Sequence, residues 1–282
     1  MKTTKAAMES ERNGVRVTVP KTVGFQGAPG GSCRERIDAL RRTKLEHTRR
    51  KIELGNLGSI DDYGLIPWAD PIPFEPRPNH PSGICHGMRC ISESFARWLQ
   101  AIPAYIHPSS ALAGGWFSPG GYISLGWPPE ERPVHLQPLV EEYHIYMTGV
   151  GGMNHFGPDM AIGLSLGWGG LLEKIRRYRR LNRPADASFY DGEETVVLGI
   201  QRWIRRHVEQ ALEMAAREPV PALRDNLHAM AEMNEHLVTE PPATFREACQ
   251  FLAWFQSADR MWLLGGARRP WPCHGGGFLC GY

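Results

Sequence analysis

The amino-acid sequence predicts a mainly α-helical fold with few short strands. In the second half of the chain, apolar residues recur at the three- and four-residue spacing of an amphipathic helix. This spacing holds over four long segments, residues 159–182, 187–218, 222–238 and 242–264. Proline and glycine, in contrast, interrupt residues 55–90 and 117–139, which argues against long helices or central strands there.

Composition narrows the class of protein. The chain has 282 residues, of which 42% are apolar, and a formal net charge of +2. A charge this small gives no electrostatic case for binding nucleic acid, and the basic runs at 40–51 and 174–183 are interpreted as solvated helix faces. No segment reaches the roughly 18 apolar residues of a membrane span, and the first residues lack the apolar core of a secretory signal. We therefore expect a cytoplasmic protein without a membrane partner.

The six cysteines are expected to be free thiols, because a disulfide framework is typical of small secreted domains. Two short segments, "CHGMRC" at 85–90 and "CHGGGFLC" at 273–280, pair a Cys-His with a later cysteine. A zinc site is the alternative interpretation, but neither spacing matches a common zinc motif. Cys249 is expected to be a small buried apolar residue on a helix face.

The first part of the chain predicts one charged helix. Residues 1–32 are interpreted as a flexible arm that ends at Ser32, which would form a capping box with Glu35. A helix over 33–54 should follow, and its apolar stripe consists of Ile37, Leu40 and Leu45.

Shorter elements are expected in the middle of the chain. A short helix is predicted over 90–103, and a short strand is predicted near three apolar residues, Ile106, Leu112 and Trp116. The spacing in residues 139–149 fits a helix or a strand, so this choice stays open.

The helix predicted after residue 159 has two informative features. Asp159 stands at or beside its N-cap, where an acidic side chain suits the helix dipole. Gly163 and Gly167 lie four residues apart and form a bare stripe that another backbone could approach closely.

The last predicted helix covers 242–264 and has Thr244 as its expected cap. Its buried side is predicted to consist of four residues, Phe245, Cys249, Leu252 and Phe255. Residues 265–282 lose the helical periodicity and are rich in Gly, Pro, Arg and Cys, so they are interpreted as an atypical tail. A frameshift after Leu264 is one hypothesis for it.

The order of these segments resembles the N-terminal part of the glycyl radical enzymes, the pyruvate formate-lyase-like family, over residues 33–264. Five stretches carry the resemblance: "ERIDALRRTKLEHTRRKIE", "LQAIPAYIHPSSALAGGW", "NHFGPDMAIGLSLGWGGLLEKI", "FYDGEETVVLGIQRWIRRHVEQALEMA" and "PPATFREACQFLAWFQ". The resemblance implies that the chain is an N-terminal fragment of the family's ten-stranded α/β barrel.

The resemblance also implies radical lyase, dehydratase or decarboxylase chemistry on a small organic substrate in the intact enzyme. Family members bind no cofactor of their own, carry a glycyl radical installed by an S-adenosylmethionine-dependent iron–sulfur activating enzyme, and are often homodimers. They are also much longer than this chain. Neither the family's thiyl cysteine loop nor its radical glycine motif is recognisable here, and Gly281 does not fit the latter. We therefore expect a truncated protein without activity of its own.

By this resemblance, His155 and Asp159 are the predicted substrate-binding residues, because His155 aligns with the "G-H" of the family. The alternative is that both only tie a loop to a helix cap. No catalytic, cofactor-binding or metal-ligating residue is predicted. Two other functions stay open: a stand-alone helical binding or scaffold module derived from the family, and a Cys/His zinc protein.

Overall fold

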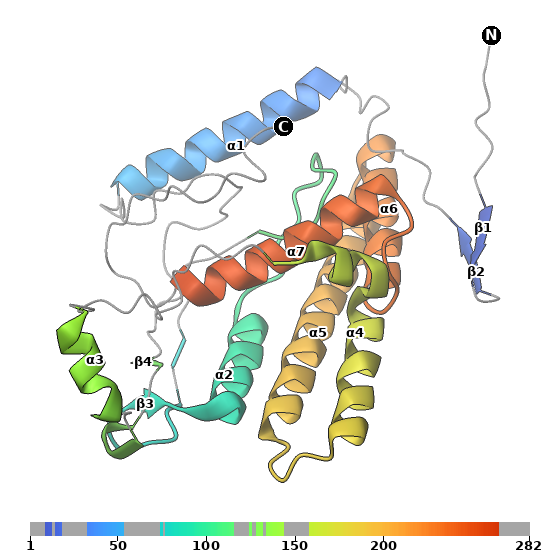
Figure 1. Ribbon diagram of the computed structural model, residues 1–282. Helices are drawn as coiled ribbons and strands as arrows, with labels where there is room; N and C mark the ends of the chain where they lie inside the picture. Colours follow the sequence, from blue (N-terminus) through green and yellow to red (C-terminus); the bar gives the residue numbers. More distant parts are fainter. Residues whose placement is uncertain are drawn as a thin grey trace.

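The computed structural model describes residues 9–12, 15–18, 33–53, 74–75, 77–115, 124–125, 128–131, 134–143 and 158–264. Helices dominate these residues, as predicted (Figure 1). The helices are α1 (Cys33–Glu53), α2 (Gly87–Ala101), α3 (Gln137–Glu142), α4 (Met160–Asn182), α5 (Ser188–Arg217), α6 (Pro221–Leu237) and α7 (Phe245–Leu264), with short 3-10 turns η3 (Pro129–Glu131) and η4 (Val134–Leu136).

The strands in the described residues are short and form two separate pairs. β1 (Glu9–Arg12) and β2 (Val15–Thr18) are antiparallel and lie within the segment predicted as an arm. β3 (Ile84–Cys85) and β4 (Ser124–Leu125) are parallel, with Ile84 opposite Ser124.

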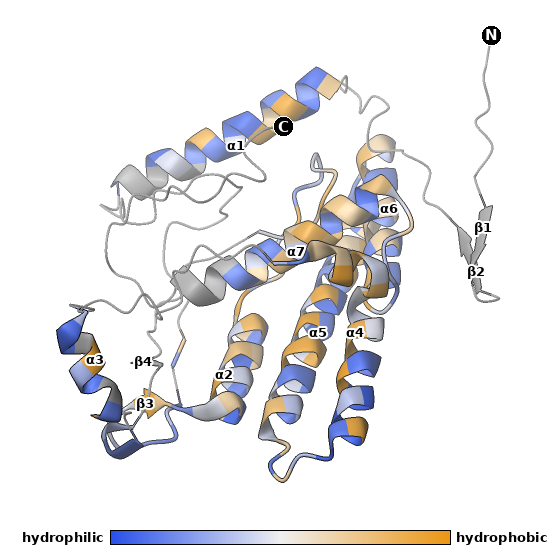
Figure 2. Ribbon diagram, viewed as in Figure 1, coloured by the Kyte–Doolittle hydropathy of each residue, from blue (hydrophilic) through white to orange (hydrophobic). Residues whose placement is uncertain are grey.

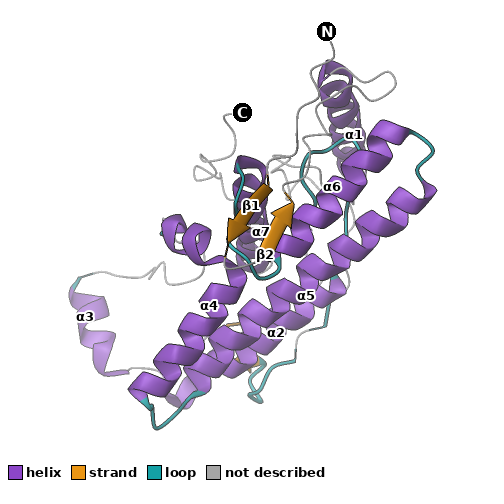
Figure 3. Ribbon diagram, turned by 90° about the vertical axis from the view of Figure 1, so that its right-hand side faces the viewer, coloured by secondary structure: helices purple, strands orange, loops and turns teal. Residues whose placement is uncertain are grey.

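The core forms around α5, which packs against α2, α4 and α6. Figure 3 shows α4 and α5 as long neighbours, and Figure 1 shows α7 running across the bundle. Hydrophobic and hydrophilic residues alternate along these helices (Figure 2), and most of the buried residues are apolar. The largest fully buried side chains include three tryptophans, Trp98, Trp203 and Trp254. Burial of these large aromatic residues, together with the aliphatic residues around them, stabilises the core.

The glycine stripe of α4 is confirmed, with a kink that the periodicity did not reveal. Gly167 has φ 62° and ψ 179°, a conformation that is nearly restricted to glycine. A β-carbon there would lie 2.5 Å from the main chain of Glu240 and Pro241, so the predicted backbone approach is real. Gly163 instead faces the ring of Phe251.

The predicted buried face of α7 is wrong. Phe245 is 86% exposed, and Cys249, Leu252 and Phe255 are only half-buried. The buried residues are Glu247, Gln250, Phe251, Trp254 and Ala258. The helix is therefore rotated: Gln250 binds the main chain of Ala113 inside the fold, and Glu247 binds the amides of Ala243 and Thr244 at the start of α7. In α1, Ile37 and Leu45 of the predicted stripe are also exposed.

Two further expectations are corrected in the middle of the chain. Ile106 and Leu112 lie in a loop, residues 102–115, because side chains of other helices bind its carbonyls where a strand partner would be. Trp116 lies outside the described residues. The open choice at 139–149 is settled as helix up to Glu142, and residues 144–149 also lie outside the described part.

The prediction that all six cysteines are free is wrong for one pair. Cys85 and Cys90 form a disulfide, because the turn between β3 and α2 brings their α-carbons to 5.7 Å. Cys33 and Cys249 are free, whereas Cys273 and Cys280 lie outside the described residues. The described residues hold no group of three or more His, Cys, Asp or Glu placed to bind a metal, and none of their helices is long and apolar enough to cross a membrane.

Candidate functional site

Of the two residues that the sequence predicts as a site, the structure describes only Asp159. Asp159 is exposed and caps α4, where its Oδ1 accepts a hydrogen bond from the amide of Ala161 at 3.0 Å. Its capping role is confirmed. His155 lies outside the described residues, so substrate binding by His155 and Asp159 stays a prediction.

A different set of polar residues converges inside the fold. Side chains of α1, α6 and α7 bind the main chain of residues 108–113, far away in sequence. We call this set the carbonyl cradle; its members are Arg36, Asn226, Arg246 and Gln250. All but Arg246 are at most 8% exposed. Within the described residues no strand pairs with this loop, and the cradle binds its carbonyls instead.

The first half of the cradle comes from α1 and α6. Arg36 donates from Nε and Nη2 to the carbonyl of Ser109, at 2.9 and 2.7 Å. Asn226 donates from Nδ2 to the carbonyls of Pro108 and Ser110, at 2.8 and 2.7 Å. Three consecutive carbonyls are therefore satisfied by two side chains, which offsets the cost of removing these carbonyls from water.

The second half comes from α7. Arg246 donates from Nε to the carbonyl of Ala111 at 2.8 Å. Gln250 donates from Nε2 to the carbonyl of Ala113 at 3.1 Å and accepts from the amide of Ala113 at 2.7 Å. Gln250 thus makes the two hydrogen bonds to Ala113 that a peptide group of a neighbouring strand would make.

Arg246 has the most unusual electrostatic environment of the cradle. Burial, together with the nearby charge of Arg36, lowers the pKa of Arg246 to about 10. Its Nη2 donates to Oδ1 of Asn226 at 3.2 Å, whereas its Nη1 is buried and has no hydrogen-bond partner in the part of the chain that the structure describes. Arg246 stays cationic at neutral pH, and the two N–H groups of its Nη1 can donate to a further acceptor.

An aromatic cluster lies beside the cradle. Gly114 is next to Ala113, and a β-carbon on Gly114 would stand 2.6 Å from the ring of Trp254. Trp254 packs edge-to-face on Trp203 and His207, with ring centroids 4.6 and 4.7 Å away. His207 is 1% exposed, and burial lowers its pKa to about 4, so the imidazole is neutral at physiological pH. Its Nδ1–H donates to the carbonyl of Trp203 at 2.9 Å.

Sequence reasoning missed the cradle and His207. In α7, Glu247, Gln250 and Trp254 are spaced three and four residues apart, which places them on one face. In α5, His207 continues the row of Trp203 and Ile204. A polar residue at the same helical spacing as the buried apolar residues is the sequence signal that could have identified the cradle and His207.

Comparison with known proteins supports the fold. The model of the family "Pyruvate formate lyase-like" matches residues 141–265, which include α4 to α7. No curated protein matches the chain in sequence. Among solved structures, the glycerol-bound B12-independent glycerol dehydratase from Clostridium butyricum superposes with a TM-score of 0.50 and 16% identity, over 64% of this chain and 30% of the dehydratase.

Two further solved structures are similar at lower TM-scores. A glycyl radical enzyme from Archaeoglobus fulgidus has a TM-score of 0.48 and 20% identity, over 62% of this chain and 29% of that one. Hydroxyproline dehydratase from Clostridioides difficile, with trans-4-hydroxy-L-proline bound, has a TM-score of 0.44 and 14% identity, over 63% and 29%.

The chain thus spans about 30% of the length of the solved proteins that it matches. The family match covers α4 to α7, which supply much of the core and three of the four residues of the carbonyl cradle. The resemblance identified in the sequence is thereby confirmed, because residues 141–265 match the model of the pyruvate formate lyase-like family and the solved structures that the chain resembles include glycyl radical enzymes.

Proposed function

We propose that this chain is the N-terminal helical part of a glycyl radical enzyme that acts on a small organic substrate. The observation that carries the proposal is the family match over 141–265, which coincides with the packed helices α4 to α7. The intact enzyme would be a lyase, dehydratase or decarboxylase, and its α/β barrel would be completed by further polypeptide. This chain alone would be inactive, because the thiyl cysteine and the radical glycine would belong to that further part.

The contribution of this chain would be a rigid wall. The carbonyl cradle fixes residues 108–113 against α6 and α7, and a catalytic pocket gains from walls that do not move. In the intact enzyme, His155 and Asp159 would line the pocket near the start of α4. An imidazole there could exchange a hydrogen bond with a substrate hydroxyl or carbonyl.

The proposed partners follow from the family. A separate S-adenosylmethionine-dependent iron–sulfur enzyme would install the radical, and this protein would need no cofactor of its own. A cytoplasmic homodimer is the proposed form of the intact enzyme.

The first experiment is to resequence the gene past the codon of Leu264 and to read the downstream DNA in all three frames. We expect one frame to encode a cysteine loop and, later, a radical glycine motif. The extended protein, activated anaerobically by its partner enzyme, should then give the electron paramagnetic resonance doublet of a glycyl radical. The chain of residues 1–282 under the same conditions should give none, and neither should the extended protein with alanine at the radical glycine.

The absence of any continuing frame would overturn the proposal of a glycyl radical enzyme and favour a stand-alone helical binding module. One observation supports this second candidate: α7 presents Phe245, 86% exposed, together with the half-buried Leu252 and Phe255. An apolar helix face of this kind is typical of a contact surface. Light scattering of residues 1–282 should then show a stable dimer that Phe245→Ser dissociates.

A further inference from the structure

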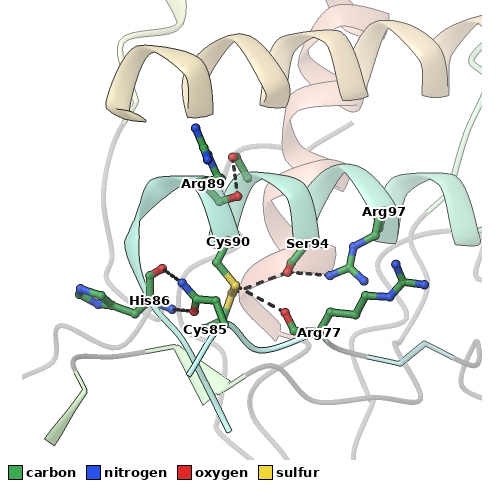
Figure 4. Close-up of a disulfide and its surroundings, with 9 residues drawn as sticks. Arg77, Cys85, His86, Arg89, Cys90, Ser94 and Arg97 are labelled. Atoms are coloured by element: carbon green, nitrogen blue, oxygen red, sulfur yellow. Dashed lines mark hydrogen bonds between the residues drawn. A yellow bond between two sulfur atoms is a disulfide. The ribbon is translucent and has the colours of Figure 1, made fainter. Parts of the chain in front are cut away.

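The disulfide between Cys85 and Cys90 closes a small ring at the start of α2 (Figure 4). Cys85 is the last residue of β3, and Cys90 lies in the first turn of α2. Gly87, between them, has φ 75°, which allows the chain to turn from strand to helix inside the ring. Cys85 is 2% exposed and Cys90 is 7% exposed.

The two sulfurs have different polar neighbours. Ser94 Oγ lies 3.7 Å from Cys85 Sγ, and Arg97 Nη2 donates to the same Oγ at 3.1 Å. Since a disulfide sulfur carries no hydrogen, the Ser94 hydroxyl is the donor and Cys85 Sγ is the acceptor. A directed chain of hydrogen bonds therefore runs from the Arg97 guanidinium through Ser94 to Cys85, as Figure 4 shows.

Cys90 faces an acceptor instead. Its Sγ lies 3.6 Å from the carbonyl oxygen of Arg77. The oxidised sulfur has no hydrogen to donate to this carbonyl, but a reduced Cys90 thiol does. Reduction would therefore add a hydrogen bond at Cys90, while the donor from Ser94 stabilises a thiolate at Cys85. The start of α2 adds the positive end of a helix dipole one turn or less from both sulfurs.

From these contacts, we propose that Cys85 and Cys90 form a reversible thiol–disulfide exchange site, whose reductant is a dithiol. One thiolate of the dithiol attacks the Sγ of Cys90, the less buried of the two cysteines, and a mixed disulfide forms. The Cys85–Cys90 bond breaks, and its electron pair leaves on Cys85 Sγ, which accepts the hydrogen bond of Ser94.

The second thiol of the reductant then loses its proton and attacks the reductant's first sulfur, which is bonded to Cys90 in the mixed disulfide. The reductant leaves as a cyclic disulfide, and the electron pair stays on Cys90 Sγ, which takes up a proton. The resulting Cys90 thiol donates a hydrogen bond to the carbonyl of Arg77. Two electrons pass from the dithiol to the cysteine pair. Access to Cys90 needs only an opening of the first turn of α2, and helix ends open at low cost in free energy.

The test uses the full chain with Cys33, Cys249, Cys273 and Cys280 changed to serine, so that only the pair remains. The protein is equilibrated in mixtures of reduced and oxidised dithiothreitol, alkylated, and weighed by mass spectrometry. We expect either two alkylated cysteines or none, in one reversible two-electron transition. Two thiols that stay alkylatable in fully oxidised buffer, at unchanged circular dichroism, would overturn the proposal.

A matched pair of variants tests the directed hydrogen bond. Ser94→Ala removes the donor to Cys85, whereas Ser92→Ala removes an equally buried hydroxyl of α2 that donates to the carbonyl of Arg89 at 3.1 Å and does not touch sulfur. Ser94→Ala should slow reduction by dithiothreitol by about threefold, because the leaving thiolate of Cys85 loses the hydrogen bond from the Ser94 hydroxyl. Ser92→Ala should reduce at the parent rate. Equal slowing in both variants would assign the effect to packing and overturn the role of Ser94.

Discussion

The indole Nε1–H of Trp254 donates a hydrogen bond to Oδ1 of Asn234 at 2.8 Å, and both side chains are at most 1% exposed. Asn234 in turn donates from Nδ2 to the carbonyl of Met230 at 2.8 Å. The pair therefore joins α6 to α7 by a polar contact inside an apolar core, where an unpaired donor is costly.

Asn234→Ala should lower the free energy of unfolding by about 2–3 kcal/mol, because it leaves the Trp254 indole unsatisfied and opens a small cavity. Trp254→Phe removes the other partner, and the double variant closes a thermodynamic cycle. Urea denaturation should give a coupling energy of about 1 kcal/mol or more. Strictly additive effects would show that the hydrogen bond contributes nothing to stability.

Gly167→Ala should destabilise the protein by about 3 kcal/mol or more. The new β-carbon would meet the main chain of Glu240 and Pro241 at 2.5 Å, and alanine rarely adopts φ 62°. Gly170→Ala is the matched control, because its β-carbon would meet only the Leu166 side chain, at 3.1 Å. It should change stability by no more than about 1 kcal/mol. Similar losses in both variants would contradict the role of the kink.

The sequence predicted the long helices well, because their bounds follow local rules. Apolar rows and end signals placed α5 and α6 within a residue of their observed bounds, and the cap at Asp159 was found in the same way. The buried face of α7 was missed for a physical reason. The buried face of α7 includes Glu247 and Gln250, and a prediction based on apolar spacing assigns such polar residues to the exposed face.

The cradle could not be predicted from local patterns, because its partners are distant in the sequence. Arg36 binds a carbonyl 73 residues away, and Gln250 binds one 137 residues away. The pairing of Cys85 with Cys90 was missed for another reason. The absence of a secretory signal favours free thiols, whereas the turn at the start of α2 brings these two cysteines together.

Glu247 should be essential for the start of α7. Its Oε2 accepts from the amides of Ala243 and Thr244, both at 2.7 Å, and Thr244 Oγ1 accepts from the amide of Glu247 at 3.2 Å, which completes a capping box. Glu247→Ala should cost about 2–3 kcal/mol by urea denaturation. The exposed Glu232, changed to alanine, is the control and should have little effect. A loss below about 0.5 kcal/mol for Glu247→Ala would contradict the importance of the box.

The pH dependence of stability should report on His207. Burial lowers the pKa of His207 to about 4, from 6.5 in an unfolded chain. Between these values the unfolded state binds a proton that the folded state does not, so stability falls as the pH is lowered from 6.5 to 4. The slope from this group is at most about 1.4 kcal/mol per pH unit, and the full loss is about 3 kcal/mol.

His207→Phe keeps an aromatic ring between Trp203 and Trp254 and removes the titrating group. Its unfolding free energy should depend less steeply on pH than that of the parent between pH 6.5 and 4, in urea titrations at constant salt. Glu247 acts in a lower window. Burial by itself would raise the pKa of Glu247, but hydrogen bonds from His236 and two amides outweigh it and lower the pKa, so its contribution is lost only as the pH falls below about 4.5. Identical slopes in parent and His207→Phe would rule out a buried neutral imidazole.

Variants of Asp159 can separate its observed role as a helix cap from its proposed role in substrate binding. As the N-cap of α4, its carboxylate accepts from the amide of Ala161, and Asp159→Ala should cost about 1 kcal/mol of unfolding free energy. Asp159→Asn should cost less than about 0.5 kcal/mol, because asparagine caps helices as well as aspartate does. In the intact enzyme, the proposed substrate contact would need the charge, so Asp159→Asn should raise the KM while leaving thermal stability unchanged. If the asparagine variant keeps the KM and the stability of the parent, the proposed substrate contact is contradicted. Helix capping alone would then account for Asp159.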